Sequence, residues 1–406
     1  MKFALFGEDP AALEVAEAVS VSTAHELALV CEIAGSPIAQ FTGLRDTVEW
    51  ESLLHHPQVD AVIVARHPDL DLHAERLRKL FQAAMPMIVV HPACESIVCY
   101  ELDMIRKDTG GIVYAHCPGQ AHQGFRALRE IVADDASPLG PIQQVSFDRS
   151  LHDQHRSEVT MQLARDVQLI RQMVGEVTSV SAISATRDAE NYANLNVNLT
   201  TASGTLVRWT AGPVDRQPEG RLVVTGSTGK AVLLMPTDQS PWRMECTGRK
   251  PAEFAGDGEP QQVLEQFTSL VQSGKQADSW TDACRSGEVA DTVAHSLRRG
   301  RTIDLYGEVP SEESTFKGMM AAGGCAMLML SFVAVLLASV AEAIGLAGWI
   351  DRIIDGTGIG LLSFARSEYW LGWLLALLLV FLLLQTLKLV FARQGQNENP
   401  VSDREK

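Results

Sequence analysis

The chain has little positive charge and no paired cysteine motif. Lys and Arg number 34 against 50 Asp and Glu, a formal net charge of −16 at pH 7, which argues against a nucleic-acid partner. The 7 cysteines are an odd number without a C-x-x-C pair, which argues against a disulfide framework and against a zinc site. We expect no signal peptide, because Met1–Phe6 is too short for its apolar core. The folded part should therefore stay in a reducing compartment.

Long stretches without charge are present near the carboxyl end. Gly318–Ala341 contains 24 residues without a formal charge, and Tyr369–Leu387 contains 19. About 20 apolar helical residues cross the hydrocarbon core of a bilayer, which is roughly 30 Å thick. The pattern predicts a membrane hairpin. Its parts are a linker at 306–317, a transmembrane helix at 318–346, a loop at 347–368, a second transmembrane helix at 369–391 and a polar tail at 392–406.

Residue types inside the two stretches support this prediction. Ala334 and Ala338 have the spacing that permits close contact between membrane helices, and Trp370 and Trp373 are typical of a membrane interface. Anionic headgroups repel an acidic protein, so attachment must come from apolar insertion. A core hairpin is the weaker alternative, because Leu374–Leu384 is apolar on every face. We expect a multi-pass protein of the cell membrane with its soluble domains and both termini in the cytoplasm.

Short apolar runs alternate with helical patterns in the first 120 residues. Such runs between helices indicate a parallel sheet that is covered on both faces. Residues 1–120 are therefore predicted to form an α/β Rossmann-like, dinucleotide-binding type of domain. The runs are Phe3–Phe6, Leu27–Ile33, Val59–Ala65, Met87–Val90 and Gly111–Ala115.

The pattern changes near residue 140, where alternating strand candidates follow one another. Clustered strands of this kind suggest an antiparallel sheet with one exposed face. Two helical patterns, Pro260–Ser273 and Thr281–Arg299, come after them. Residues 121–305 are therefore predicted to form an α+β domain with an open antiparallel sheet. The strand candidates are Ile142–Asp148, Val177–Ala185, Ala193–Thr200, Thr205–Ala211, Leu222–Thr225 and Ala231–Met235.

Four segments together carry a family resemblance. They read HPQVDAVIVARHPDLDLHAERLRKLFQAAMPMIVVHPACES, LREIVADDASPLGPIQQVSFDR, LVVTGSTGKAVLLMP and FTSLVQSGKQADSWTDACRSGEVADTVAHSLRRGRTIDL. In order and spacing, most of residues 1–305 resembles the Gfo/Idh/MocA family, named for glucose–fructose oxidoreductase and inositol dehydrogenase. The resemblance implies a Rossmann domain, an open-sheet domain and NAD(P)-dependent oxidoreductase activity. The membrane hairpin is not part of the usual family pattern.

The phosphate-binding loop departs from the family. Members carry G-x-G-x-x-G, whose glycines allow a tight turn and close approach to the pyrophosphate. Here Gly7 is retained, but Asp9 stands at the second position and Ala12 at the third. A carboxylate about 4 Å from a phosphate charge costs on the order of 4 kcal/mol at an effective dielectric near 20, and Pro10 removes an N–H donor. The alternative is a structural role, with Asp9 as helix N-cap and Pro10 as the first helical residue.

Two further positions belong to the implied cofactor site. Glu32 ends the second strand, where the family places an acid for the ribose 2′-hydroxyl, so any cofactor is expected to be NAD rather than NADP. The alternative is an ordinary solvated glutamate. The resemblance also places Pro68 at the cofactor, and the following His73 is interpreted as a structural contact at a helix start.

The catalytic lysine of the family is replaced. Members have Glu-Lys-Pro after the strand that corresponds to Met87–Val90, and this chain has Val90-His91-Pro92. His91 therefore occupies the lysine position. A histidine can titrate near neutral pH and donate a proton to a substrate hydroxyl, so His91 is a candidate acid/base, and a polar residue lining a vestigial pocket is the alternative.

The histidine and aspartate that face the substrate in the family are also replaced. Gly175 fixes the register, which puts Arg165 at the histidine position and Gln168 at the aspartate position. Arginine stays protonated and cannot act as a general base. Asp166 is one residue away from the histidine position, so its side chain should point to a different face of the helix.

A pair of histidines, His152 and His155, has the spacing of a metal-site fragment. No third His, Cys, Asp or Glu stands at a sequence spacing typical of a metal site. We interpret both as exposed loop residues and expect no metal site.

Three hypotheses remain open. The preferred one is a membrane-anchored Gfo/Idh/MocA-like pseudoenzyme with degraded cofactor and catalytic motifs, which binds a sugar-like or nucleotide-like ligand or a partner enzyme. The second is an active NAD-dependent oxidoreductase that acts on a sugar, cyclitol or nucleotide-sugar hydroxyl and uses His91. The third is an interaction domain that forms homo-oligomers through the exposed sheet face. Fold alone does not decide among them.

Overall fold

The structure, a computed structural model, divides the chain into two units, Met1–Gly307 and Glu308–Lys406. The structure describes nearly all residues of the first unit and five single residues of the second. The described residues are 1–33, 50–55, 59–67, 69–134, 136–185, 190–192, 194–214, 219–236, 240–256, 258–274 and 278–305 of the first unit, and Met329, Phe332, Val333, Leu336 and Val340 of the second.

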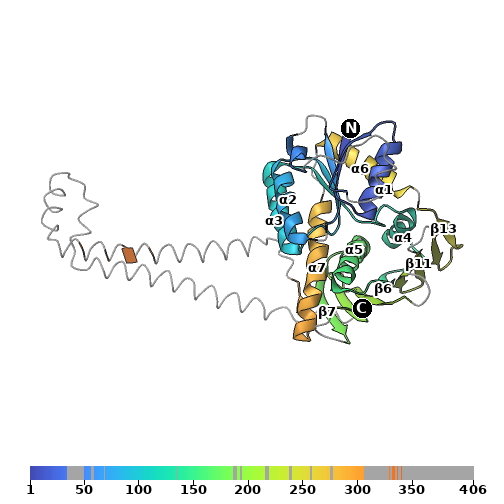
Figure 1. Ribbon diagram of the computed structural model, residues 1–406. Coiled ribbons are helices and arrows are strands. Elements are labelled where there is room, and N and C mark those ends of the chain that lie inside the picture. The colour runs from blue at the N-terminus through green and yellow to red at the C-terminus, as the bar shows by residue number, and fades with distance from the viewer. Residues whose placement is uncertain are drawn as a thin grey trace, which may run out of the picture. The chain divides into compact units, whose positions relative to one another are not determined.

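A five-stranded parallel sheet occupies the amino-terminal part of the first unit (Figure 1). Its strand order is β2-β1-β3-β4-β5, and every pair within it is parallel. The predicted Rossmann-like sheet is thereby confirmed. The strands are β1 (Lys2–Phe6), β2 (Glu26–Cys31), β3 (Ala61–Val64), β4 (Met87–Val90) and β5 (Val113–His116).

Helices cover both faces of this sheet, as the uninterrupted apolar runs predict. Successive side chains of a strand point to opposite faces, and alternate residues accordingly join two separate apolar clusters. One cluster includes α1 (Pro10–Val21) and α6 (Glu259–Ser273), and the other α2 (Leu70–Gln82) and α3 (Ser96–Thr109). Trp50–His55 forms a 3-10 helix beside the second cluster.

A nine-stranded sheet follows, with the order β13-β12-β11-β10-β6-β9-β8-β7-β14. Its one covered face packs on α4 (Gln123–Ala133), α5 (Arg156–Val174) and part of α7 (Ser279–Arg299). The strands are β6 (Ile142–Leu151), β7 (Val177–Ser184), β8 (Leu195–Thr201), β9 (Leu206–Pro213), β10 (Glu219–Gly226), β11 (Lys230–Pro236), β12 (Trp242–Cys246), β13 (Ala252–Phe254) and β14 (Ile303–Asp304).

The second sheet is mixed rather than antiparallel. Strand β6 runs parallel to β9, from the pair Gln144 and Leu206 to the pair Leu151 and Pro213. The neighbouring pairs are antiparallel, including β6 with β10 and β8 with β9. The prediction of an antiparallel sheet is therefore wrong at this central pair, where the long connection through α5, β7 and β8 sets the strand direction.

Helix α7 packs against both sheets. Trp280, near its start, lies in the core of the parallel sheet, with its ring 5.0 Å from that of Phe81. Val293 and Leu297, near its end, belong to the core of the mixed sheet. The helix thus contributes side chains to the cores of both sheets.

The predicted transmembrane segments lie outside the described residues except at five positions. Those five residues of the second unit are helical, apolar and exposed. Among the helices that the structure describes, none is both long enough and apolar enough to cross a bilayer. The hairpin therefore stays a prediction.

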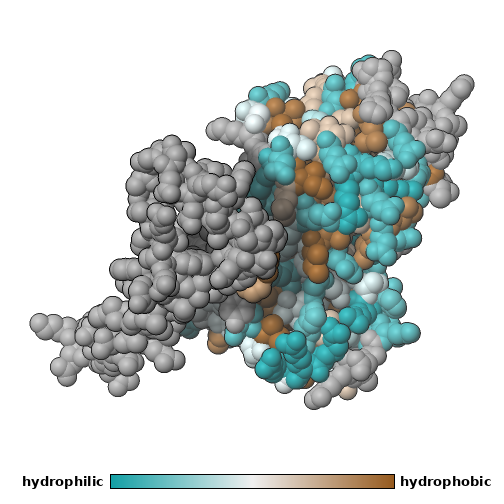
Figure 2. All heavy atoms as spheres, turned by 90° about the vertical axis from the view of Figure 1, so that its left-hand side faces the viewer, coloured by the Kyte–Doolittle hydropathy of each residue, from teal (hydrophilic) through white to brown (hydrophobic). Residues whose placement is uncertain are grey.

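Figure 2 shows the side of the first unit on which helices α2, α3 and α7 lie. The described part of this surface is mainly hydrophilic. Small hydrophobic areas interrupt it (Figure 2). On α3, Ile97 and Met104 are exposed at 80% and 68%. A polar surface of this kind agrees with the strongly negative net charge of the chain.

Candidate functional site at the carboxyl ends of the parallel strands

The candidate site lies where β1, β3, β4 and β5 end and α5 passes close by. In open α/β sheets, ligands bind at the carboxyl ends of the strands. The loops after these strands begin at Gly7, Ala65, His91 and Cys117. Helix α5 adds Arg165, whose Nε donates a hydrogen bond of 2.9 Å to the His91 carbonyl oxygen.

The turn after β1 keeps the glycine that its geometry requires. Gly7 has a φ of +83°, which favours glycine because a side chain there is strained. A Cβ at Gly7 would also lie 3.2 Å from the Cβ of Ala65. The Gly7 amide donates to the Cys31 carbonyl at 3.0 Å and so joins β1 to β2.

Asp9 is the N-cap of α1. Its Oδ1 accepts a hydrogen bond of 2.9 Å from the Ala11 amide, and Pro10 is the first helical residue. The structural role expected for both residues is confirmed. Ala12 is fully buried under the helix, so the small third position serves close packing. The amino-terminal end of α1, where dinucleotide-binding folds receive a pyrophosphate, carries a carboxylate of the protein itself.

Arg165 brings three of the predicted positions together. Its Nη2 atom lies 3.9 Å from Asp9 Oδ2, and its Nε donates a hydrogen bond to the His91 carbonyl oxygen. The Arg165 and Asp9 side chains are only 15% and 11% exposed. Burial lowers the pKa of Arg165 and the Asp9 carboxylate raises it, and arginine stays protonated throughout the working pH range. Asp9, His91 and Arg165 stand at the family's positions for the second glycine, the lysine and the histidine. The Arg165 guanidinium therefore connects all three positions.

A second ion pair lies beside the first. Arg66, in the loop after β3, donates from Nη2 to Glu158 Oε1 at 2.7 Å. Glu158 is in the first turn of α5. The two arginines thus tie α5 to the ends of β1, β3 and β4. Nothing in the sequence pattern singles out Arg66 or Glu158.

His91 is buried and neutral. Burial lowers its pKa to about 3, with the nearby Arg165 and Arg171 charges acting in the same direction. Its Nε2 is buried and has no hydrogen-bond partner among the described residues. Such a pKa does not suit titration near neutral pH, because the imidazole is removed from water and faces cations. The acid/base role of His91 stays a prediction. His116, at the end of β5, has its pKa lowered to about 3 by burial and by Arg165.

The two residues of α5 after Arg165 have structural partners. Gln168 Oε1 accepts a hydrogen bond of 2.7 Å from the Ser286 hydroxyl of α7. Asp166 points elsewhere, as predicted, and is fully buried. Its carboxylate accepts two hydrogen bonds from Arg149, at 2.6 and 2.9 Å, and one of 2.8 Å from Trp209 Nε1. Both side chains are thus engaged by groups of the protein itself.

Glu32 is exposed and forms an ion pair. Its carboxylate lies 2.5 Å from Arg76 Nη1, and the Arg76 side chain is 12% exposed. The Arg76 guanidinium also lies over the rings of Phe6 and Trp50, at 5.6 and 5.7 Å from their centroids. The carboxylate expected to meet a ribose hydroxyl is thus engaged by the protein. Pro68 lies outside the described residues.

The other histidines singled out in the sequence lie away from the ion pairs of Arg165. His73 is buried in α2 and stacks on His67 with centroids 6.0 Å apart. His155 is the N-cap of α5 and is exposed, as is His152. Among the described residues, no group of three or more His, Cys, Asp or Glu side chains is arranged to hold a metal ion.

A titratable group that sequence patterns do not reveal lies behind the site. Glu259, at the start of α6, accepts a hydrogen bond of 2.7 Å from the Gly119 amide in the loop after β5. Burial raises the pKa of Glu259 to about 7, against the opposing effect of hydrogen bonds from Gly119 and Ala121. Glutamate at the first turn of a helix is so common that the sequence offers no signal for this shift.

Comparisons with known proteins identify the fold. No protein-family model and no curated protein matches the sequence. Among solved structures, the chain is similar to a myo-inositol dehydrogenase from Corynebacterium glutamicum, at 16% identity and a TM-score of 0.61, covering 75% of this chain and 98% of that one. It is similar to GenD2 from gentamicin A biosynthesis in complex with NAD, at 17% identity and a TM-score of 0.63, covering 76% and 97%.

A 3-ketoreductase from Actinomadura kijaniata in complex with TDP-benzene and NADP is a third similar structure. It shares 17% identity at a TM-score of 0.60, covering 72% of this chain and 96% of that one. All three are matched over nearly their whole length, and the part of this chain beyond them is about a quarter. Residues of the first unit thus have the fold of Gfo/Idh/MocA-type dehydrogenases.

Proposed function

We propose that this chain is a membrane-anchored protein with a dehydrogenase fold that binds a sugar-like ligand or a partner enzyme and does not carry out hydride transfer. The observation that carries the proposal is the Arg165 side chain, which links Asp9 to the His91 carbonyl. This contact fills the positions that the Gfo/Idh/MocA resemblance assigns to the pyrophosphate, the lysine and the histidine.

The residues present do not fit a dinucleotide. A pyrophosphate at the start of α1 would meet the Asp9 carboxylate, which is already capping the helix. It would have to compete with Asp9 for the Arg165 charge, since the two lie 3.9 Å apart. Pro10 contributes no N–H to an incoming phosphate. Each of these features disfavours an anion where the family binds one.

None of the described side chains at the family's catalytic positions is suited to general acid/base catalysis near pH 7. A catalytic base works best with a pKa near the operating pH, whereas burial holds the pKa of His91 and of His116 at about 3. Arg165 stays protonated, and Gln168 does not titrate. An unreactive site is the simpler account of this set of residues.

The membrane anchor is a separate part of the proposal. It is supported by the charge-free runs Gly318–Ala341 and Tyr369–Leu387 and by the five described residues of the first run, which are helical, apolar and exposed. We expect the full-length protein to stay with the membrane fraction after extraction with alkaline carbonate and to dissolve only in detergent. Release into the aqueous supernatant would refute the anchor.

Calorimetric titration of the full-length protein with NAD and NADP tests the loss of cofactor binding. We expect no binding in the micromolar range and no turnover of sugars or cyclitols. A triple variant, Asp9→Gly with His91→Lys and Arg165→His, restores the family residues and is expected to gain affinity for NAD. The triple variant raises the net charge by one unit, so a Glu75→Gln variant, at an exposed position of α2, controls for the change in charge. Micromolar binding of NAD by the wild-type protein together with turnover of any polyol would overturn the proposal.

The second candidate function is NAD-dependent oxidation of a sugar, cyclitol or nucleotide-sugar hydroxyl. One observation favours it, the positive φ of Gly7, which keeps the turn that dinucleotide folds need. The solved structures in complex with NAD and NADP are consistent with it. A kinetic measurement decides, because this candidate requires turnover that a His91→Ala variant loses.

We also propose that the chain forms homo-oligomers through the open face of the nine-stranded sheet. Ile183 and Leu206 are exposed on it at 63% and 59%. Light scattering of the detergent-solubilised protein should give more than one chain per particle, and Ile183→Lys should reduce that number. A monomer at all protein concentrations would count against this surface.

A further inference from the structure

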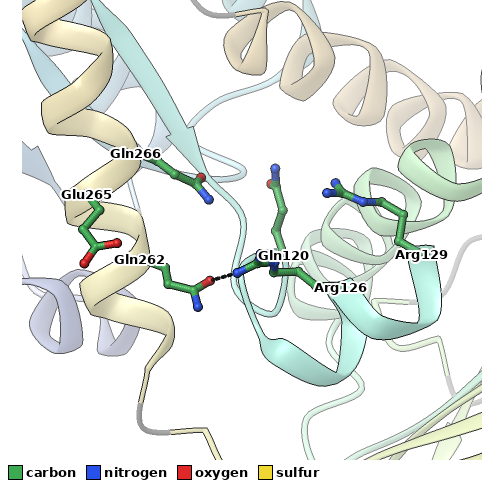
Figure 3. A pocket seen from close by; sticks show the side chains of 6 residues that line it. All are labelled: Gln120, Arg126, Arg129, Gln262, Glu265 and Gln266. Carbon is green, nitrogen blue, oxygen red and sulfur yellow. Dashed lines mark hydrogen bonds between the residues drawn. The ribbon is translucent and has the colours of Figure 1, made fainter. Parts of the chain in front are cut away.

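A polar pocket lies between α4 and α6, away from the ion pairs of the candidate site. Its volume is about 360 Å³, at the small end of the range for ligand pockets. Figure 3 shows side chains from both helices and from the loop after β5 around this space. The six lining residues are Gln120, Arg126, Arg129, Gln262, Glu265 and Gln266.

Two guanidinium groups in this pocket have neutral partners. Arg126 Nη1 donates to Gln262 Oε1 at 2.8 Å, and Arg129 Nη1 donates to Gln172 Oε1 at 3.5 Å. Among the ion pairs of the described residues, neither arginine has a carboxylate partner, although the chain carries a net charge of −16. Glu265 also lines the pocket, and in Figure 3 its side chain points away from both arginines. The lining thus carries two positive charges and one negative charge.

Three amide side chains, those of Gln120, Gln262 and Gln266, complete the polar lining beside the charged residues. The Tyr114 hydroxyl donates to Gln266 Oε1 at 2.8 Å, which leaves the Gln266 amide nitrogen free to turn to the pocket. The Oε1 atom of Gln120 is buried without a hydrogen-bond partner among the described residues. An unpartnered buried acceptor costs free energy that a ligand hydroxyl can recover. None of the six lining residues is aromatic, so the pocket offers no surface for stacking a nucleobase.

We propose that this pocket binds the phosphate monoester of a small polyol. Arg126 and Arg129 bind the phosphate through charge-assisted hydrogen bonds, and the amides of Gln120, Gln262 and Gln266 donate to and accept from the hydroxyls. The small volume and the lack of aromatic residues select against nucleotides. The loop that carries Gln120 is held in place by Glu259, which accepts from the amide of the preceding Gly119.

This site is independent of the proposed function, because no lining residue contacts Asp9, His91 or Arg165 in the described hydrogen bonds and ion pairs. A ligand bound here leaves the carboxyl ends of the parallel strands unchanged. The two proposals can therefore fail separately.

Calorimetry on the full-length protein in detergent tests the pocket with glycerol 3-phosphate and glucose 6-phosphate as probes and glycerol as the uncharged control. We expect one phosphate ester bound per chain and no heat from glycerol. Arg126→Gln and Arg129→Gln should each weaken binding about tenfold or more, since hydrogen bonds to charged groups contribute strongly. Arg299→Gln makes the same charge change at the exposed end of α7 and should leave affinity unchanged.

Binding should also weaken below about pH 6, where a phosphate monoester takes up its second proton. Circular dichroism of each variant establishes that it is folded before binding is compared. The proposal is overturned if neither ester binds, if glycerol binds as well as its phosphate, or if both arginine variants bind like the wild type. Loss of binding in Arg165→Met with retention in Arg129→Gln would assign the phosphate to the other site and would also overturn it.

Discussion

The contact between Asp9 and Arg165 can be tested by a double-mutant cycle. Asp9→Asn removes the charge but keeps an oxygen that caps α1 by accepting from the Ala11 amide, since Asn and Asp are about equally good N-caps. Arg165→Met removes the guanidinium and keeps much of the apolar stem. The two single variants, the double variant and the wild type isolate the energy of the pair.

The structure gives the scale of the effect. At 3.9 Å and an effective dielectric near 20, two unit charges attract each other by about 4 kcal/mol. Both side chains keep some contact with water, and Arg165 also binds the His91 carbonyl. The measured coupling should therefore be smaller, about 1–3 kcal/mol. Asp9→Asn alone leaves a buried arginine without its carboxylate, so it should destabilise the protein more than the double variant does.

Urea unfolding at pH 7, followed by circular dichroism at low and at high salt, measures the four free energies of unfolding. Asp9→Ala is the matched control for the cap, and it should cost about 1 kcal/mol beyond Asp9→Asn. The coupling should change little with salt, because partly buried pairs are weakly screened. A coupling energy below about 0.3 kcal/mol, within the usual additivity error, would refute the idea that this ion pair organises the site.

Three other changes have expected outcomes. Asp166→Asn leaves the paired Arg149 beside a neutral group in the core and should lower the free energy of unfolding by about 3–5 kcal/mol, measured in urea. Gly7→Ala places a side chain at a φ of +83° and should cost about 1–2 kcal/mol, seen as a lower melting temperature. The raised pKa of Glu259, about 7 against 4.5, means that the folded state holds this proton more tightly than the unfolded state. Stability should therefore fall as pH rises from about 4.5 to about 7, by at most about 3 kcal/mol at 1.36 kcal/mol per pKa unit. Glu259→Gln should remove this part of the pH dependence of the urea midpoint, and an unchanged profile would contradict the assignment.

The parallel sheet was predictable because its strands are buried on both faces. Met87–Val90 is predicted from four consecutive apolar residues, and β4 has the same bounds. Val59–Ala65 is predicted as a strand, and β3 is its central part, Ala61–Val64. Apolar runs of this length between helical patterns indicate few other structures.

The mixed sheet was less predictable. Alternation of apolar and polar residues indicates a strand with one buried face, but it does not indicate whether that strand runs parallel or antiparallel to its neighbours. Val207 and Trp209 in β9 are buried with exposed residues between them, a pattern that fits parallel and antiparallel neighbours equally well. The path of the chain decides that β6 and β9 run parallel. That path depends on where α5 packs, which no local pattern records.

The candidate site was predictable in its positions but not in its contacts. Comparison with a family motif singles out Asp9, His91 and Arg165 one at a time. Arg165 lies 74 residues beyond the carbonyl that it binds, and no spacing in the sequence relates the two. Arg66 and Glu158 form an ion pair across 92 residues and match no motif, so only the fold brings them together.

The contacts change how the three replacements are to be understood. Taken singly, Asp9, His91 and Arg165 are three separate departures from the family motif. In the fold they form one connected group, in which the arginine charge offsets the aspartate charge and the histidine is kept neutral by burial. An isolated Asp9 at the end of β1, or an isolated buried Arg165, would each be costly, whereas together they are compatible. The three departures from the family motif thus form one connected site, and Asp9→Gly alone should destabilise the protein without producing affinity for NAD.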